Sequence, residues 1–218
     1  MKIFDISRTL SAELPPWPGD VGFTYQVNGR IAEGSSVNVG SINMSLHNGT
    51  HADASYHFDD NGWTMEQAKL ETYFGPAVVV DLTERYERTA GATRLPQVQI
   101  SDLEPAADEL EATGRLLLKS GVWRDPKVFP DPIPTVARDV PAWLKARGVK
   151  LLGLDVPSVD EIDAKELVNH HALGAAGINI VESLDLCAVS AGRYHFLALP
   201  LKIAGADGSP VRAILWRE

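Results

Sequence analysis

The sequence predicts a single α/β domain, and three observations lead to that prediction. The chain has 218 residues, a length typical of one domain, and 44% of them are apolar, enough for a sizeable core. Short apolar runs of strand length alternate with segments of helix length that carry capping residues. Charged residues make up 22% and no segment is repetitive, so residues 1–218 are expected to fold as one unit without a disordered linker.

The first third of the chain is expected to be mostly β-structure. Strand candidates are residues 2–7, 23–27, 37–46 and 76–82. The sequence WPGD at 17–20 places proline and glycine as a type II turn requires. Between 37 and 46 the apolar residues change parity at Gly40-Ser41, so a bulge or bend is expected there.

The remaining two thirds mix helices and strands. Helices are predicted over 101–112, 139–147 and 163–173, and strands over 115–121, 149–157, 178–184, 196–204 and 210–216, the last two paired across a turn at 205–209. Ser101 with Glu104, and Asp163 with Glu166, have the spacing of capping boxes. Gly174 follows the third helix as a terminating residue.

Charge and cysteine content exclude several classes of function. The net charge of −9 and the pI of about 5.1 disfavour a nucleic-acid partner, because an acidic chain repels phosphate. No run approaches the roughly 18 apolar residues of a membrane span, and the first ten residues lack the apolar stretch of a signal peptide. The one cysteine, Cys187, rules out an intrachain disulfide, and its apolar surroundings suggest an inert core thiol. A cytoplasmic protein without a membrane or nucleic-acid partner is therefore expected.

A cluster of histidines lies in the sequence HNGTHADASYHF. His47, His51, Asp53 and His57 share one parity, so an extended chain would turn three imidazoles and a carboxylate to one side. Imidazole and carboxylate together suit zinc, manganese or iron. The alternative, that these are ordinary polar loop residues, fits one histidine better than four ligand-type side chains on one face.

A second group of ligand-type residues follows at 170–182. His170 and His171 lie in the third predicted helix and Glu182 in the strand after it, so one of the two histidines can return beside the glutamate. The residues alone do not choose between them, and a solvated helix face is the alternative for both. Two groups suggest two metal ions, with Asp53 as the bridging carboxylate and a water activated between ions about 3.5–4 Å apart.

His57 is then free for proton transfer, because its usual pKa range suits a general acid or base. Other catalytic devices have no motif here: the chain lacks G-x-S-x-G, a Walker A loop and G-x-G-x-x-G. Trp17 could equally line a pocket or cap the core as a turn residue, whereas Phe58 and Trp63 are expected in the core.

The string His47-x-Gly49-Thr50-His51-x-Asp53-x-x-x-His57-Phe58 resembles the signature of the metal-dependent cyclase-like hydrolases. Three further elements are similar to that family in the same order: WPGD at 17–20, DVPSVDEIDAKELVNHHAL at 155–173 and LPLKIAGADGSPVRAIL at 199–215. One departure is Ser55, where the family usually has proline, which would stiffen the loop before His57. The resemblance covers nearly the whole chain.

The resemblance implies a swivelling β/β/α fold, a homodimer with sites near the subunit interface, and two zinc ions per subunit, with manganese as an alternative metal. It implies a first metal held by His47, His51 and Asp53 and a second held by Asp53, His170 and Glu182. It favours His170 over His171, makes His57 the proton-transfer residue and places Trp17 on the substrate pocket.

The expected function is hydrolysis of a small aromatic formamide, N-formyl-L-kynurenine, to L-kynurenine and formate by a metal-activated water, a step of tryptophan degradation. One alternative is a sibling hydrolase that opens a cyclic amide or lactone, since the metal chemistry would be shared. A metal-binding scaffold without catalysis is an alternative of another class. The presence of every expected ligand and of His57 argues against it.

Overall fold

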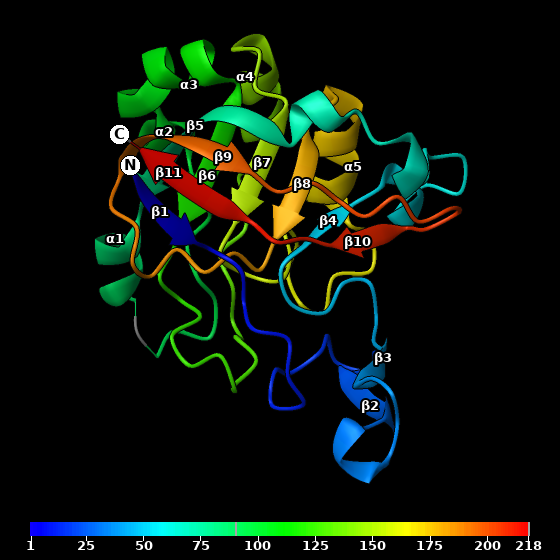
Figure 1. Ribbon diagram of the computed structural model, residues 1–218. Helices are drawn as coiled ribbons and strands as arrows, with labels where there is room; N and C mark the ends of the chain where they lie inside the picture. The colour runs from blue at the N-terminus through cyan, green and yellow to red at the C-terminus, as the bar shows by residue number, and fades with distance from the viewer. Residues whose placement is uncertain (90, 218) are drawn as a thin grey trace.

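A computed structural model describes residues 1–89 and 91–217 of the chain. Its main sheet has nine strands in the order β1-β11-β9-β5-β6-β7-β8-β4-β10 (Figure 1). These strands are β1 (Lys2–Asp5), β4 (His51–Asp53), β5 (Phe74–Asp81), β6 (Arg115–Lys119), β7 (Leu151–Leu154), β8 (Asn179–Glu182), β9 (Gly192–Leu197), β10 (Gly208–Pro210) and β11 (Ile214–Arg217). The helices are α1 (Thr83–Glu87), α2 (Ile100–Leu103), α3 (Ala107–Thr113), α4 (Val140–Ala146) and α5 (Val168–Ala176).

The centre of the sheet is parallel and its two flanks are antiparallel. Strands β5, β6, β7 and β8 run parallel, and their Cα partners include Val78 with Leu116, Leu116 with Leu152, and Leu152 with Ile180. The antiparallel strands β9, β11 and β1 continue one flank, and β4 and β10 continue the other. Apolar side chains on both faces suit strands covered on both sides.

Two hydrophobic cores lie on opposite faces of this sheet. In one core, the paired strand residues Val78, Leu116, Leu152 and Ile180 pack against residues of all five α-helices, such as Leu110 of α3 and Leu144 of α4. Figure 1 shows α3, α4 and α5 on that side of the sheet. The other core joins Phe4 of β1 to Ala52 of β4, from opposite ends of the strand order. The sheet therefore curls around its second core, and the predicted α/β fold class is confirmed.

A two-stranded arm stands apart from this body. β2 (Thr24–Gly29) and β3 (Val39–Asn43) pair only with each other, and Figure 1 shows them projecting from the domain. The parity change expected at Gly40-Ser41 is absent from β3. The irregularity lies instead between Val27 and Gly29 on the partner strand, and β3 ends at Asn43 rather than at residue 46.

Two predicted helices have different bounds in the structure. The segment 101–112 is divided into α2, a 3-10 turn (Glu104–Ala106) and α3, because Pro105 cannot continue the hydrogen-bond pattern of α2. Its capping box is formed by Gln99 and Asp102, not by Ser101 and Glu104.

The helix expected over 163–173 begins later, at Val168, and ends at Ala176, with Gly177 as its C-cap. Its cap is not Asp163 with Glu166. The carboxylate of Asp160 accepts hydrogen bonds from the N–H groups of Asn169 and His170 at 2.9 and 3.1 Å. Gly174, expected after the helix, lies inside it.

The prediction of a C-terminal strand pair was only partly correct. β11 does pair with β9, with Ile214 opposite Leu197, but β9 begins at Gly192, and residues 198–207 are irregular. β10 pairs with β4 instead, with Gly208 opposite Asp53. Among the described residues, no helix is long and apolar enough to cross a membrane.

Candidate metal centre

The first histidine cluster is brought together by turns on either side of a short strand, and not by one extended segment as the shared parity suggested. His47 to Thr50 form a turn, only His51 to Asp53 are extended, and His57 ends a 3-10 turn (Ser55–His57). Gly49 has a φ of 73°, and a Cβ there would lie 2.8 Å from Leu10 Cδ2, so glycine is required where His47 folds back.

Strand pairing brings two further carboxylates to the cluster. β4 lies antiparallel to β8 with His51 directly opposite Glu182, and their Nε2 and Oε2 atoms are 3.5 Å apart. On its other side β4 pairs with β10, which places Asp207 beside His47. A Cβ at Gly208 would lie 2.8 Å from His47 Cε1, so this close approach also depends on a glycine.

Asp53 lies at the centre of two groups of ligand atoms. Its Oδ1 is 3.1 Å from His47 Nδ1 and 3.3 Å from His51 Nε2. Its Oδ2 is 3.8 Å from His170 Nε2, which is also 3.7 Å from Glu182 Oε1. Each group of three offers ligand atoms that all lie within 4.8 Å of one another. The two oxygens of one carboxylate thus face two separate groups, the arrangement expected of a bridging ligand.

Hydrogen bonds fix the imidazole tautomers on both sides. His51 Nδ1–H donates to the carbonyl oxygen of Gly49 at 2.8 Å. His170 Nδ1–H donates to Asp160 Oδ2 at 2.7 Å. In both rings the Nε2 lone pair is therefore left facing Asp53 and Glu182. Metal-binding histidines are commonly oriented in this way by a carbonyl or a carboxylate on the other nitrogen.

Two buried polar atoms at the centre have no hydrogen-bond partner: His51 Nε2 and Asp53 Oδ2. Both residues are almost fully buried, at 1% and 3% exposure. A buried lone pair without a partner is costly, and native proteins usually supply one. A cation with nitrogen and oxygen ligands would supply it to both atoms, so the residues present fit a metal.

The charges of the cluster also favour a bound cation. Burial alone would lower the pKa of His47 and His51, but the neighbouring carboxylates of Asp207, Asp53 and Glu182 raise it to about 9 and about 10, respectively. Burial raises the pKa of Glu182. The close approach of His47 and His51 holds the pKa of Asp53 well below its usual range despite burial. Buried carboxylates of this kind need positive charge beside them, from protons or from a metal.

His57 lies next to the two groups that share Asp53, and with His47 and Asp207 it forms a third set of ligand-type atoms that lie within 4.8 Å of one another. Its ring stacks on His47 with centroids 3.9 Å apart, and its Nδ1 is 3.7 Å from Asp207 Oδ2. Burial, reinforced by the neighbouring histidines, lowers the pKa of His57 to about 4. An uncharged, partly exposed imidazole here can accept and return a proton. Ser55, expected to loosen this loop, accepts a hydrogen bond from the Trp63 N–H at 2.8 Å.

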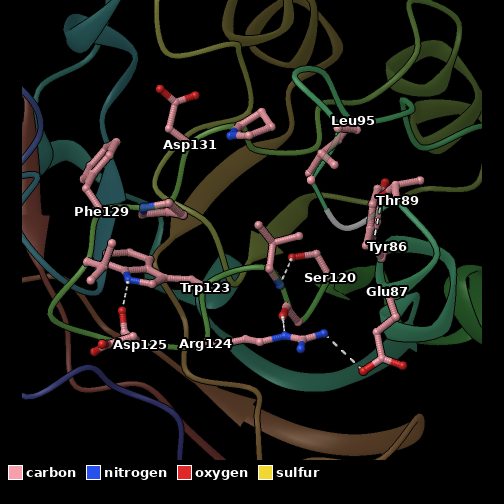
Figure 2. Close-up of a pocket in the computed structure, with 17 residues that line it drawn as sticks. Tyr86, Glu87, Thr89, Leu95, Ser120, Trp123, Arg124, Asp125, Phe129 and Asp131 are labelled. Atoms are coloured by element: carbon pink, nitrogen blue, oxygen red, sulfur yellow. Dashed lines mark hydrogen bonds and ion pairs between the residues drawn. The ribbon is translucent and has the colours of Figure 1, made fainter.

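A pocket of about 300 Å³ opens onto the histidines, Glu182 and Trp17. Trp17 packs edge-on against Phe129, with ring centroids 5.7 Å apart. Trp123 and Phe129 complete an aromatic wall that also borders a second pocket of about 460 Å³, where Figure 2 shows the two side chains together. Trp17 therefore lies at the pocket rather than only in a turn.

The structure also places several residues outside the ligand groups. Phe58 and Trp63, expected in the core, are only partly buried; Trp63 packs against the core of Phe4 and Ala52, and both line a pocket of about 480 Å³ on another side of Asp53. His171 is exposed and packs against Phe58, away from the two groups. Cys187 is exposed, not a core thiol.

Asp160 and Asp207 were missed by the sequence analysis, although both contact cluster histidines. Asp160 lies ten residues before His170 in a loop, and Asp207 lies in a segment that was interpreted as a hairpin turn. The only signal was their position in the two segments, 155–173 and 199–215, that resemble the cyclase-like family.

Comparisons with known proteins identify the family and similar relatives. The family described as putative cyclase matches residues 4–161. A kynurenine formamidase from Bacillus thuringiensis subsp. konkukian is 41% identical over 211 residues, which is 97% of this chain and 95% of the relative. A kynurenine formamidase from Geobacillus thermodenitrificans is 42% identical over the same shares of the two chains.

Solved structures share the fold. A potential metal-dependent hydrolase with cyclase activity superposes with a TM-score of 0.78 at 26% identity, over 100% of this chain and 98% of the other. Isatin hydrolase A from Labrenzia aggregata superposes with a TM-score of 0.82 at 20% identity, over 98% and 93% of the two chains. At this identity the second likeness concerns the fold alone.

Proposed function

This chain belongs to the putative cyclase family, and we propose that within it the protein is an arylformamidase that hydrolyses N-formyl-L-kynurenine to L-kynurenine and formate. The observation that carries the proposal is identity of about 41% over 97% of the chain to kynurenine formamidases. The ligand groups, His57 and the aromatic pocket support it, because each part has a task in hydrolysing an aromatic formamide. The reaction belongs to tryptophan degradation.

The proposed cofactors are two zinc ions per subunit, with manganese as the alternative. His47, His51 and Asp53 would hold one ion, and Asp53, His170 and Glu182 the other. Ions bound at such a site lower the pKa of a coordinated water toward neutrality and polarise a carbonyl oxygen. The unpartnered His51 Nε2 and Asp53 Oδ2 support this assignment.

The chain's own residues supply binding and proton transfer. Hydrolysis adds water across the C–N bond, so the water loses a proton and the departing arylamine nitrogen gains one. His57 lies on the pocket wall beside both ligand groups, where it can take the first proton and deliver the second. Trp17, Trp123 and Phe129 offer ring faces and edges to the substrate's aromatic ring.

A sibling activity, the opening of a cyclic amide or lactone such as isatin, is the second candidate. The fold is shared with isatin hydrolase A from Labrenzia aggregata, but the identity of 20% is half that to the kynurenine formamidases. The deciding experiment measures kcat/KM of the metal-loaded protein on N-formyl-L-kynurenine and on isatin in parallel. A preference for the formamide supports the proposal, and a preference for isatin overturns the substrate while keeping the site.

The proposed assembly is a homodimer. The arm of β2 and β3 exposes Tyr25, Val27, Val39 and Ile42, which are 39–61% accessible although apolar. An exposed apolar arm is suited to packing against a second copy of the chain. Light scattering is expected to give twice the monomer mass of 23.7 kDa, and Tyr25→Asp with Ile42→Asp is expected to give monomers.

The proposed location is the cytoplasm. One cysteine in 218 residues, exposed and without a second for an intrachain disulfide, fits a reducing compartment. Fractionation of cells that make the protein tests this directly, with recovery among secreted proteins as the contrary result.

A further inference from the structure

We propose that Asp20 binds the α-ammonium group of the substrate and so selects formamides that carry an amino-acid side chain. The inference rests on the proposed function, which it deepens by naming the residue that recognises the part of the substrate farthest from the scissile bond.

Asp20 lies in the wall of the pocket and is held there. The turn from Trp17 to Asp20 is closed by a hydrogen bond of 2.9 Å from the Asp20 N–H to the Trp17 carbonyl oxygen, with Gly19 at a φ of 97°. This turn directs Trp17 and Asp20 into the same pocket. The Ser45 hydroxyl donates to Asp20 Oδ2 at 2.9 Å, which leaves Oδ1 for a ligand.

The charges around the pocket favour a cation at this point. Among the described residues that line it, the carboxylates are Asp20 and Glu182, and no lysine or arginine is present. Glu182 is 3% exposed and belongs to a ligand group, so it is committed to the metal centre. Asp20 is exposed and is the carboxylate of the lining that is left for a substrate group.

The pocket offers a surface for each group of the substrate. The buried ligand groups, where the formyl group must react, line one part of it. The aromatic side chains of Trp17, Trp123 and Phe129 suit the ring. Asp20 lines the same pocket three residues from Trp17, and because it is exposed it can meet the side chain that carries the ammonium. A carboxylate that accepts hydrogen bonds from an ammonium group adds both attraction and direction.

The test compares substrates that differ only in this side chain. One is N-formyl-L-kynurenine, and the other is 2′-formamidoacetophenone, which has the same formamide and ketone but no amino-acid group. In Asp20→Asn, the ratio of their kcat/KM values is expected to fall about five- to tenfold, as loss of a partly exposed charged hydrogen bond would give. The fall should come from a higher KM for N-formyl-L-kynurenine.

A third substrate and matched variants sharpen the test. The deaminated acid 4-(2-formamidophenyl)-4-oxobutanoate keeps the carboxylate but lacks the ammonium, so Asp20→Asn should improve its kcat/KM by removing a repulsion. Asp20→Glu should keep most of the selectivity. Asp108→Asn removes the same charge from the exposed surface of α3, whose described residues do not line this pocket, and should leave the ratio at its wild-type value.

Binding of the products separates this inference from the proposed function. Calorimetry on the metal-loaded protein with L-kynurenine and 2-aminoacetophenone needs no turnover, and Asp20→Asn should weaken only the former, by a similar factor. The role of Asp20 would be overturned if Asp20→Asn changed neither the ratio of the two kcat/KM values nor the ratio of the two product affinities. Equal losses of affinity for L-kynurenine and 2-aminoacetophenone would overturn it as well. A wild-type protein that hydrolyses neither formamide overturns the proposed function instead, and the binding ratio still decides on Asp20.

Discussion

The imidazole of His170 donates its Nδ1 proton to the carboxylate of Asp160, with 2.7 Å between Nδ1 and Oδ2. The same carboxylate accepts hydrogen bonds from the N–H groups of Asn169 and His170 in the first turn of α5. One buried side chain therefore caps the helix and also orients the histidine it carries. Helix start and ligand geometry are coupled through Asp160.

We predict that Asp160→Ala weakens binding at the second metal group about 10- to 100-fold, as the loss of outer hydrogen bonds to metal ligands typically does. Competition with a chromophoric chelator measures the affinity. Asp160→Asn, which can still accept a hydrogen bond from His170 Nδ1–H, should lie between alanine and wild type. An affinity unchanged in Asp160→Ala would show that α5 alone holds His170 in place.

The two adjacent histidines of α5 should behave differently. His170→Ala is expected to remove one metal equivalent and reduce turnover by more than about 100-fold, since it deletes a ligand of the second group. His171→Ala should retain most activity and metal, because His171 is exposed and faces Phe58. Metal analysis and kcat on the same samples measure both effects. The reverse order would refute the ligand assignment.

His57→Asn should reduce kcat by about 10²- to 10⁴-fold, the usual contribution of a positioned general acid or base. We propose that the ions are held by the two groups that share Asp53, so metal content should stay near that of wild type, whereas an ion held by His47, His57 and Asp207 would be lost. Parallel measurement of kcat and bound metal is required. Loss of metal together with activity would instead make His57 a ligand.

Tyr86 provides a pH prediction away from the metal centre. Burial raises the pKa of Tyr86 to about 12. A folded-state pKa above the unfolded value near 10 gives stability that is present below pH 10 and is lost as the pH rises through 12. With metal removed by a chelator, the free energy of unfolding of the wild type should exceed that of Tyr86→Phe by about 1 kcal/mol at pH 8, because the Tyr86 hydroxyl donates a hydrogen bond to the Pro96 carbonyl oxygen. The difference should be smaller at pH 11.

Urea unfolding at the two pH values measures this difference in the free energy of unfolding. Because both proteins share every other titrating group, their common loss of stability at alkaline pH cancels. A difference that stays constant or grows from pH 8 to pH 11 would contradict the raised pKa.

Local patterns were sufficient to predict most strands and the two segments that carry the candidate ligands. The buried runs around Val78, Leu116 and Leu152 became adjacent parallel strands, because their length and apolar character leave little choice. The pairing of His51 with Glu182 could not be derived from the sequence, since strand order is a property of the whole sheet. The residue types were already concentrated in two segments, but the choice of His170 over His171 came from the resemblance to the cyclase-like family.

Two of the failures share a physical cause: hydrogen bonds to residues outside the local pattern. Asp160 caps α5 from ten residues away from His170, so the local pattern of Asp163 and Glu166 gave the wrong helix start. Asp207 reaches His47 only because β10 pairs with β4 instead of forming a hairpin. Single-residue periodicity carries no information about such partners.

The most direct test of the central claim is a zinc titration of the metal-free protein, following N-formyl-L-kynurenine hydrolysis and bound metal on one sample. The account predicts no hydrolysis without metal and a rate that reaches its plateau at two equivalents per chain, since Asp53 joins two groups of ligands. Hydrolysis that persists without metal, or a plateau at one equivalent, would contradict a binuclear centre built on Asp53.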